Sequence, residues 1–329
     1  MIDVKKTTEI VGRTVLVTGA SGFVGHFLCD LLLAQGFNVC GTLLKLGNHS
    51  LLVSGVEPVT IKPLSADTEW NHALAGVDSI IHLAARVHIM DDSSADPLTE
   101  FRRVNVEGTA QLAREAAKAG VKRLVFISSI KVNGEESAIP YTQDSPPNPT
   151  DPYGISKWEA EQALRKIEAE TGLEIVIVRP PLVYGPGVKA NFFKMIKIIS
   201  RGVPLPLASI TNKRSLIYVG NLVEALATCA SHPSAAGKTY LLSDGEDVST
   251  PELIRRTAKA LGVPARLLPF PLPLMRLAGK LTGKSGAVNR LTGSLTVDSS
   301  RMRQELGWTP PFTMEQGLEK TAKWFKEQF

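Results

Sequence analysis

A tyrosine and a lysine stand four residues apart in the stretch YGISK, as Tyr153 and Lys157. This spacing places both side chains on one face of a helix. A lysine ammonium near the phenol should lower the tyrosine pKa, because it favours the charged phenolate. The phenol could then give and take a proton near neutral pH. The pair therefore predicts acid–base chemistry.

A serine hydroxyl lies upstream of this pair, at the end of the apolar run RLVFISS. Ligands gather at the carboxyl ends of strands in doubly wound sheets, so Ser129 could hydrogen-bond a substrate oxygen beside the tyrosine. Ser128 is its neighbour, but strand alternation sends adjacent side chains to opposite faces. YxxxK alone is common by chance, whereas the upstream serine makes the pattern specific. We predict Ser129, Tyr153 and Lys157 as the catalytic residues.

The stretch TGASGFVGHFL follows the first apolar run and leads into a helical pattern. Gly19, Gly22 and Gly25 give the spacing GxxGxxG, a variant of the dinucleotide fingerprint. Glycines allow a tight turn and a close approach to a pyrophosphate, and the helix N-terminus offers free N–H groups. A glycine-rich turn without a ligand is the alternative. The position within the first strand–helix unit favours a dinucleotide site.

The choice of dinucleotide depends on the end of the second strand. NAD binders often carry an acidic residue there, which holds the adenine ribose. Here the sequence is Thr42-Leu43-Leu44-Lys45, without an acid. Lys45 could meet a 2′-phosphate or could be solvated, and the two readings are equally open. NAD is the predicted cofactor, and NADP stays open.

Two histidines in HLAARVH raise the question of a metal. The stretch follows an apolar run, so we interpret it as a strand end lying under the cofactor. His82 is then a buried, hydrogen-bonded strand residue, while Arg86 and His88 begin a loop that could contact phosphate or sugar. No compact pairing with carboxylates supports a metal site, and none is predicted.

Apolar runs and helical patterns alternate through the first half of the chain. This alternation predicts an α/β fold of the Rossmann type, a doubly wound parallel sheet covered on both faces. After Pro180 prolines cluster and helices shorten. We expect a dinucleotide-binding domain over 1–180, joined by a strand near 240–244, and a smaller, mainly substrate-binding region over 181–329. The predicted strands span 14–19, 37–43, 78–85, 123–129 and 173–180, and the predicted helices 26–36, 98–119 and 156–172.

Composition sets the class of the 329-residue chain. Apolar residues make up 43% and charged residues 21%, with a net charge of +5. Lysines and arginines are scattered along the sequence, so we expect the protein to bind anionic small molecules and no nucleic acid. Three cysteines without a paired framework, and a charged N-terminus, predict a cytoplasmic protein without an integral membrane segment. The proline-broken apolar stretch 267–281 is expected to cover a substrate pocket, with peripheral membrane contact as the alternative.

TGASGFVG, HLAA, NVEGT, FISS, YGISK and RPPLVYGPG occur in this order. In this the chain resembles the extended short-chain dehydrogenase/reductase family, and within it the nucleotide-sugar epimerases and reductases. The resemblance implies a Rossmann domain, a nicotinamide cofactor and the triad already predicted. It suggests Asn105 as a structural or proton-relay asparagine, equally open to being a helix-packing amide. The implied cofactor contacts are Gly19, Ser21, Gly22, Phe23, Val24, Gly25, Lys45, Leu83, Ala84, Ala85, Tyr153 and Lys157.

The resemblance also picks residues on the substrate side. Asn191 of ANFF resembles an asparagine that contacts the nucleotide diphosphate, and Arg214 and Arg290 resemble diphosphate clamps. A guanidinium suits a phosphate geometrically, although either arginine could instead form a surface salt bridge. Together with Arg86 and Ser129, these are the predicted substrate-binding residues.

Departures from the family pattern narrow the activity. The acid after the second strand is missing, and Ile130-Lys131 stands where dehydratases carry Asp-Glu. We therefore predict a nucleotide-diphospho-sugar C4 epimerase, acting by transient hydride transfer on a UDP-hexose or UDP-N-acetylhexosamine, as a homodimer. The alternative is an NAD(P)H-dependent 4-keto-sugar reductase of polysaccharide biosynthesis. A cofactor-sensing protein without turnover is disfavoured, because a sensor would not need the Tyr153–Lys157 pair.

Overall fold

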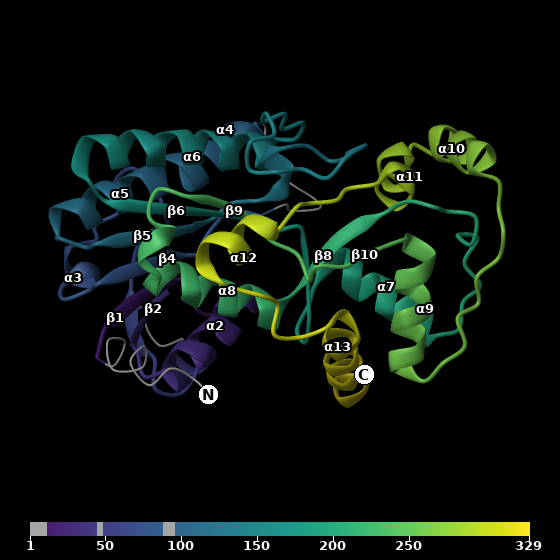
Figure 1. Ribbon diagram of the computed structural model, residues 1–329, viewed down its shortest axis with the longest axis horizontal. Coiled ribbons are helices and arrows are strands. Elements are labelled where there is room, and N and C mark those ends of the chain that lie inside the picture. Colours follow the sequence, from purple (N-terminus) through teal and green to yellow (C-terminus); the bar gives the residue numbers. More distant parts are fainter. Residues whose placement is uncertain (1–11, 45–48, 88–95) are drawn as a thin grey trace.

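A seven-stranded parallel sheet forms the larger part of the molecule in the computed structural model, which describes residues 12–44, 49–87 and 96–329 (Figure 1). The strand order is β3-β2-β1-β4-β5-β6-β9, and every pairing is parallel. The predicted doubly wound α/β fold is confirmed. The strands are β1 (Thr14–Thr18), β2 (Asn38–Leu43), β3 (Glu57–Thr60), β4 (Ser79–His82), β5 (Arg123–Ile127), β6 (Glu174–Arg179) and β9 (Thr239–Leu241).

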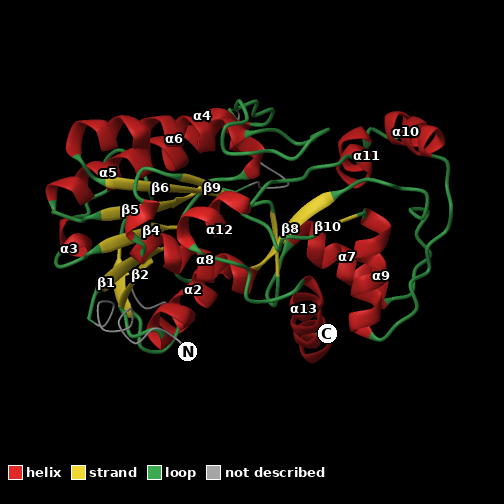
Figure 2. Cartoon of the chain, viewed as in Figure 1, coloured by secondary structure: helices red, strands yellow, loops and turns green. Residues whose placement is uncertain are grey.

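Helices cover both faces of this sheet, as Figure 2 shows. One face packs on α2 (Phe23–Ala34) and α8 (Val219–Ser231), the other on α3 (Asn71–Leu74), α5 (Gly108–Lys118) and α6 (Pro152–Thr171). Strand alternation divides the side chains between the two cores. Val15 and Val17 face the first core, while Leu16 between them faces the second. Because both faces of the sheet are buried, the strands are continuous apolar runs in the sequence.

The strand order reverses between β1 and β4. From β1 the chain moves outward to β2 and β3, then returns to β4 on the other side and continues outward to β9. The loops after β1 and β4 therefore leave the carboxyl edge at this reversal, where a doubly wound sheet has its crevice. In doubly wound sheets this crevice is where ligands bind.

A smaller region follows β6 and contains a second, three-stranded sheet in the order β10-β8-β7. Its core is continuous with the α2 and α8 face of the large sheet, since one apolar cluster holds residues of both. Its elements are β7 (Leu182–Tyr184), α7 (Ala190–Ser200), β8 (Arg214–Tyr218), β10 (Asp247–Val248), α9 (Thr250–Leu261), α10 (Leu272–Leu281), α11 (Ser285–Thr292), α12 (Ser300–Leu306) and α13 (Met314–Gln328).

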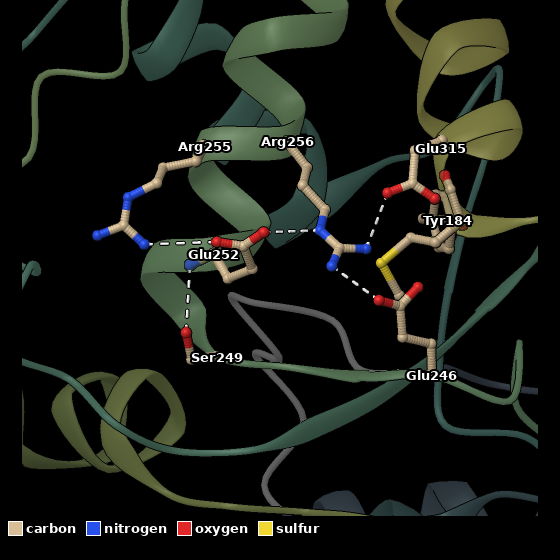
Figure 3. A network of polar contacts seen from close by, with 8 residues as sticks. Tyr184, Glu246, Ser249, Glu252, Arg255, Arg256 and Glu315 are labelled. Carbon is tan, nitrogen blue, oxygen red and sulfur yellow. Dashed lines mark hydrogen bonds and ion pairs between the residues drawn. The ribbon is translucent and has the colours of Figure 1, made fainter.

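One arginine ties three parts of this smaller region together (Figure 3). Arg256 of α9 reaches Glu246 at 2.7 Å, Glu252 at 2.8 Å and Glu315 of α13 at 2.9 Å. Three carboxylates around it raise the pKa of the Arg256 guanidinium, hydrogen bonding to Glu246 being the largest cause. The network fixes α13 against α9 from the solvent side of their apolar contact.

Some element boundaries differ from those expected. The helix expected over 98–119 is α4 (Pro97–Phe101), a π-helical turn (Arg102–Glu107) and α5. Helix α6 begins at Pro152 and not at 156, because the Asp151 side chain accepts a hydrogen bond from Gly154 N and caps it. Strand β3 was not predicted. Short 3-10 turns span His49–Leu51, Ile130–Val132 and Pro233–Ala235. Among the described helices, none is both long and apolar enough to cross a membrane.

Candidate active site

The glycine loop connects β1 to α2 and closes tightly on itself. Gly22 N donates to Gly19 O at 2.9 Å, and Gly19 has a φ of 71°, a conformation that favours glycine. A Cβ on Gly25 would overlap Gly19 O and lie 2.8 Å from Ala20 Cα. The loop therefore presents bare backbone and the N-terminus of α2 to the crevice. This cradle fits the pyrophosphate of a dinucleotide.

The loop after β4 lies against the glycine loop. A Cβ on Gly19 would be 3.0 Å from Ala84 N, so the two backbones are in contact. Thr18 joins them further, since its Oγ1 accepts from Ala84 N at 3.1 Å. The predicted cofactor residues Leu83, Ala84 and Ala85 thus sit beside Gly19, at the point where the strand order reverses. Ser21, Phe23 and Val24 belong to the same loop and the first turn of α2, and Lys45 lies outside the described residues.

His82 is a buried strand residue, as predicted. Its Nδ1 lies 2.6 Å from Thr18 Oγ1 and its Nε2 lies 2.9 Å from Thr109 Oγ1, so both ring nitrogens are satisfied. The ring also stacks on Phe126. Burial lowers the pKa of His82 to about 3, so the ring is neutral at physiological pH. His82 therefore links β4 to Thr18 and Thr109 through hydrogen bonds. His88 lies outside the described residues.

The three predicted catalytic residues come together at the ends of β5 and α6. Ser129 caps the 3-10 turn after β5, with its Oγ accepting from Lys131 N at 3.2 Å. That turn abuts the first turn of α6, which carries Tyr153, and Lys157 follows in the second turn. Lys157 Nζ donates to Ile127 O at 2.8 Å and lies 5.9 Å from the centre of the Tyr153 ring. Their catalytic roles remain predictions.

The tyrosine pKa does not shift in the expected direction. Burial raises the pKa of Tyr153 to about 12, and the Asp151 carboxylate adds to the increase. Burial also lowers the pKa of Lys157 to about 7, although Glu161 opposes this. The ammonium donates to Ile127 O and lies 4.5 Å from the centre of the Phe126 ring. It therefore does not lower the pKa of the Tyr153 phenol in this arrangement. Without cofactor, Tyr153 is therefore protonated near neutral pH.

A buried ion pair lies behind Lys157. Arg179 at the end of β6 donates through Nε to Glu161 Oε1 at 2.9 Å and through Nη2 to Oε2 at 2.5 Å. Ser128 Oγ also donates to Glu161, and Arg179 Nη1 donates to Asn133. All four side chains are buried. Sequence reasoning gave Ser128 no role and missed the others, although Glu161 stands one helical turn after Lys157.

A second charged group borders Tyr153. Lys131 pairs with Asp151, and with Glu135 at 2.9 Å. Burial lowers the pKa of Lys131, but hydrogen bonds to these two carboxylates outweigh it and raise the pKa. The side chain, which the sequence left open between solvent and pocket, is thus held at the start of α6. Its partner Asp151 was recognisable as an Asp-Pro helix start.

Asn105 lies in the π-helical turn and is buried. Its Oδ1 accepts from Arg86 N at 2.8 Å, and its Nδ2 donates to Arg86 O and to Ser156 Oγ, both at 3.0 Å. The amide therefore fixes the loop after β4 to α6. The Arg86 guanidinium lies 5.6 Å from the centre of the Phe101 ring. These contacts support the structural reading of Asn105.

Two of the predicted substrate residues lie together and one lies apart. Arg214 begins β8, and its Nη1 donates to Arg290 O at 2.9 Å and to Gly293 O at 3.1 Å. Burial lowers the pKa of Arg214, while Glu135 and Glu136 oppose the shift. Arg290 is exposed in α11, and Asn191 is exposed in the first turn of α7. Within the described ranges, no hydrogen bond joins Asn191 to either arginine.

The described residues contain no group of three His, Cys, Asp or Glu side chains placed to hold a metal ion. The predicted catalytic residues offer a phenol, an ammonium and a hydroxyl at the same edge of the sheet as the glycine loop. The phenol can exchange a proton with a substrate hydroxyl, and a nicotinamide would supply hydride transfer.

Comparison with known proteins agrees with this arrangement. Residues 15–243 match the NAD dependent epimerase/dehydratase family. A UDP-glucose 4-epimerase from Vibrio cholerae is 44% identical over 316 residues, which cover 95% of each chain. N-acetyl-alpha-D-glucosaminyl-diphospho-ditrans,octacis-undecaprenol 4-epimerase from Escherichia coli O157:H7 is 31% identical over 324 residues, 94% of each chain. The solved structure of MoeE5 with UDP-glucuronic acid and NAD is 26% identical, with TM-score 0.77, covering 96% of this chain and 100% of that one.

Proposed function

Because the chain belongs to the NAD dependent epimerase/dehydratase family, we propose that it is a nucleotide-diphospho-sugar C4 epimerase. The proposal is carried by one observation. Tyr153 and Lys157 lie on one face of α6, next to the turn capped by Ser129 and at the carboxyl edge of the sheet that holds the glycine cradle. The relatives named as 4-epimerases support the choice of C4.

Each residue of the triad has a distinct task in this proposal. The Tyr153 phenol oxygen exchanges a proton with the C4 hydroxyl of the sugar, and Ser129 Oγ orients the same oxygen by a hydrogen bond. Lys157 holds the cofactor ribose and, when protonated, lowers the tyrosine pKa. The Gly19–Gly25 loop would hold NAD, which would supply hydride transfer to and from C4 of the sugar. Lys157 must therefore leave Ile127 O, or the loaded site must supply another positive charge, before Tyr153 ionises.

The substrate side must hold the diphosphate while the sugar turns. C4 inversion requires hydrogen to leave one face of the ring and return to the other. Arg214 and Arg290 are proposed to grip the diphosphate, with Asn191 and Arg86 as further contacts. Arg214 is already anchored to the backbone of α11 and so is preorganised for this task. The substrate we propose is a UDP-hexose or a UDP-N-acetylhexosamine.

The purified protein should convert UDP-glucose to UDP-galactose, or UDP-N-acetylglucosamine to its C4 epimer, without net consumption of NAD. Proton NMR of the reaction mixture reports both epimers directly. Tyr153→Phe should reduce turnover at least about 100-fold, the usual contribution of acid–base catalysis, while NAD affinity stays nearly unchanged. A Tyr153→Phe variant with most of its kcat would refute the triad.

A 4-keto-sugar reductase would use the same triad for half of this cycle. It would bind NADPH in an otherwise empty site and would oxidise it in stoichiometric amounts. An epimerase retains NAD through purification and needs no added reductant. Release of cofactor by denaturation, followed by its identification, separates the two activities.

We also propose that the enzyme is a homodimer and works in the cytoplasm. Cys29, Cys40 and Cys229 are all free thiols, which suits a reducing compartment. Sedimentation velocity at several protein concentrations would give the oligomeric state. A monomer that is fully active would exclude the homodimer.

A further inference from the structure

Helix α10 carries an apolar stripe that faces solvent. Leu274 and Leu277 are each 52% exposed and Leu281 is 79% exposed. Their spacing of i, i+3 and i+7 aligns them on one side of the helix. The buried residues of α10 are Met275 and Gly279, on the opposite side. Leucines on a soluble helix normally face the core, so this helix is inverted with respect to the usual pattern.

The inversion follows from how α10 packs. A Cβ on Gly279 would lie 2.7 Å from Val288 Cγ2 of α11, so the two helices meet through a glycine and approach closely. This contact fixes the orientation of α10 and turns the leucine side away from the protein. Figure 1 shows α10 and α11 at the end of the molecule that is farthest from β1 and β2. Leu268, which precedes the helix, is also exposed.

Positive charge surrounds this apolar stripe. Arg276 and Lys280 flank it on α10, and Lys284 follows in the next turn of chain; all three are exposed. None of the three forms an ion pair within the described part of the chain. Between residues 262 and 297 the sequence contains no Asp or Glu. Its cations there are Arg266, Arg276, Lys280, Lys284 and Arg290.

We propose that α10 is an interfacial helix that docks the enzyme on an anionic lipid bilayer. An apolar stripe bordered by lysine and arginine matches a membrane surface, with leucines entering the acyl boundary and cations meeting lipid phosphates. Pro269 precedes the helix, Pro271 is its N-cap and Pro273 lies in its first turn, which sets the helix apart from the preceding chain. The attachment is reversible and peripheral. The proposal does not depend on which sugar the active site binds.

A second copy of the chain fits this surface less well. In a two-fold interface the same patch meets itself, so the cations would be brought against their own copies. With no carboxylate between residues 262 and 297, nothing within the segment offsets that repulsion. An anionic bilayer supplies the complementary charge and also removes the leucines from water.

Vesicle sedimentation of the full-length protein tests the proposal without any substrate. The protein should pellet with vesicles of phosphatidylcholine and phosphatidylglycerol, weakly with phosphatidylcholine alone, and less as salt increases. Leu274→Gln/Leu277→Gln/Leu281→Gln should weaken binding at least roughly tenfold, because side chains that enter the acyl region are lost. Arg276→Gln/Lys280→Gln should weaken it by roughly fivefold per charge.

Matched controls separate docking from other effects. Leu51→Gln changes a leucine that is 51% exposed between β2 and β3, and this variant should bind vesicles like the wild type. The triple leucine variant should keep its circular dichroism spectrum and its turnover of a soluble nucleotide sugar. Loss of turnover with unchanged vesicle binding would show instead that α10 covers the substrate pocket. Failure of the wild type to bind vesicles, or leucine-dependent self-association in sedimentation velocity, would overturn the proposal.

Discussion

Opposing interactions determine the pKa of the Lys157 ammonium, and therefore its charge. Burial disfavours the charged form, whereas Glu161, the Phe126 ring and Ile127 O favour it. Burial prevails, and the pKa falls from its ordinary 10.5 to about 7. The same residue is proposed to tune Tyr153, so its charge decides when the phenol can ionise.

This shift predicts a pH dependence of stability. The folded protein holds the Lys157 proton less tightly than the unfolded chain, so protonation costs stability below pH 7 and the cost vanishes as pH rises towards 10.5. Between these values the free energy of unfolding of the cofactor-free protein should increase relative to Lys157→Met, which cannot titrate there. Urea unfolding of both proteins at several pH values measures the difference. A difference that stays constant over this range would contradict the prediction.

At the scale of elements, two glycines of the GxxGxxG motif have different roles, which the sequence motif alone does not distinguish. A Cβ on Gly25 would overlap backbone of the loop, whereas a Cβ on Gly22 would lie 3.1 Å from Gly19 O, which a small adjustment can relieve. Gly25 is therefore needed for the fold, and Gly22 is proposed to be needed for access by the pyrophosphate.

Alanine substitutions should distinguish these two glycines. Gly25→Ala should lower the free energy of unfolding by about 1–3 kcal/mol, the usual cost of overpacking. Gly22→Ala should fold with nearly normal stability but bind NAD at least about tenfold more weakly, because the methyl group meets the ligand. Thermal unfolding and NAD titration of both variants check this. Equal stability loss in the two would show that the loop is packed differently.

The buried pair Glu161–Arg179 joins α6 to β6, and Glu161 lies one helical turn after Lys157, which is proposed to be catalytic. Arg179→Met would leave a buried carboxylate without its partner and should cost about 3–5 kcal/mol of stability. The double variant Glu161→Met/Arg179→Met should be less destabilised than this single one. As a control on the same helix, Glu159→Gln breaks a more exposed pair with Arg102 and should cost at most about 1 kcal/mol. A double variant less stable than Arg179→Met would mean that the pair itself is strongly favourable.

Periodic features of the elements were predictable from the sequence, and long-range contacts were not. The strands and the glycine loop follow from apolar runs and turn residues, which are local signals. Strand β3 was missed because its four residues include a proline and a glutamate. The partners Glu161 and Arg179, like Lys131 and Asp151, are brought together by the fold. The burial that dominates the pKa shifts of Tyr153 and Lys157 likewise depends on the whole fold and could not be read from spacing.

At the scale of the whole molecule, one apolar cluster runs from the large sheet into the smaller region. It includes Leu28 of α2, Leu226 of α8 and Phe325 of α13, so the smaller region shares this core with one face of the large sheet, whose other face has a core of its own. The boundary expected near residue 180 stays a prediction from the sequence pattern, and the shared cluster contains residues from both sides of it. The residues proposed to bind substrate on β8 and α11 thus belong to a region whose core is continuous with the sheet that carries the proposed triad.

This shared core predicts a single cooperative unfolding transition. Calorimetry should give a calorimetric enthalpy equal to the van't Hoff enthalpy, with no separate transition for the smaller region. NAD at 100 times its Kd should stabilise the whole protein by about 2.7 kcal/mol, since both regions unfold together. Two transitions, of which NAD moved only one, would mean that the regions fold independently.

The place of β9 has a consequence for synthesis on the ribosome. Strand β6 ends at Arg179, but its outer neighbour β9 begins only at Thr239, so β7, α7, β8 and α8 are translated between them. During this interval the edge of β6 has unpaired N–H and C=O groups, a template for wrong pairing. The outer edge of β6 in the nascent chain therefore stays unpaired until β9 has been translated. Ribosome-associated chaperones should be needed most while residues 180–241 emerge.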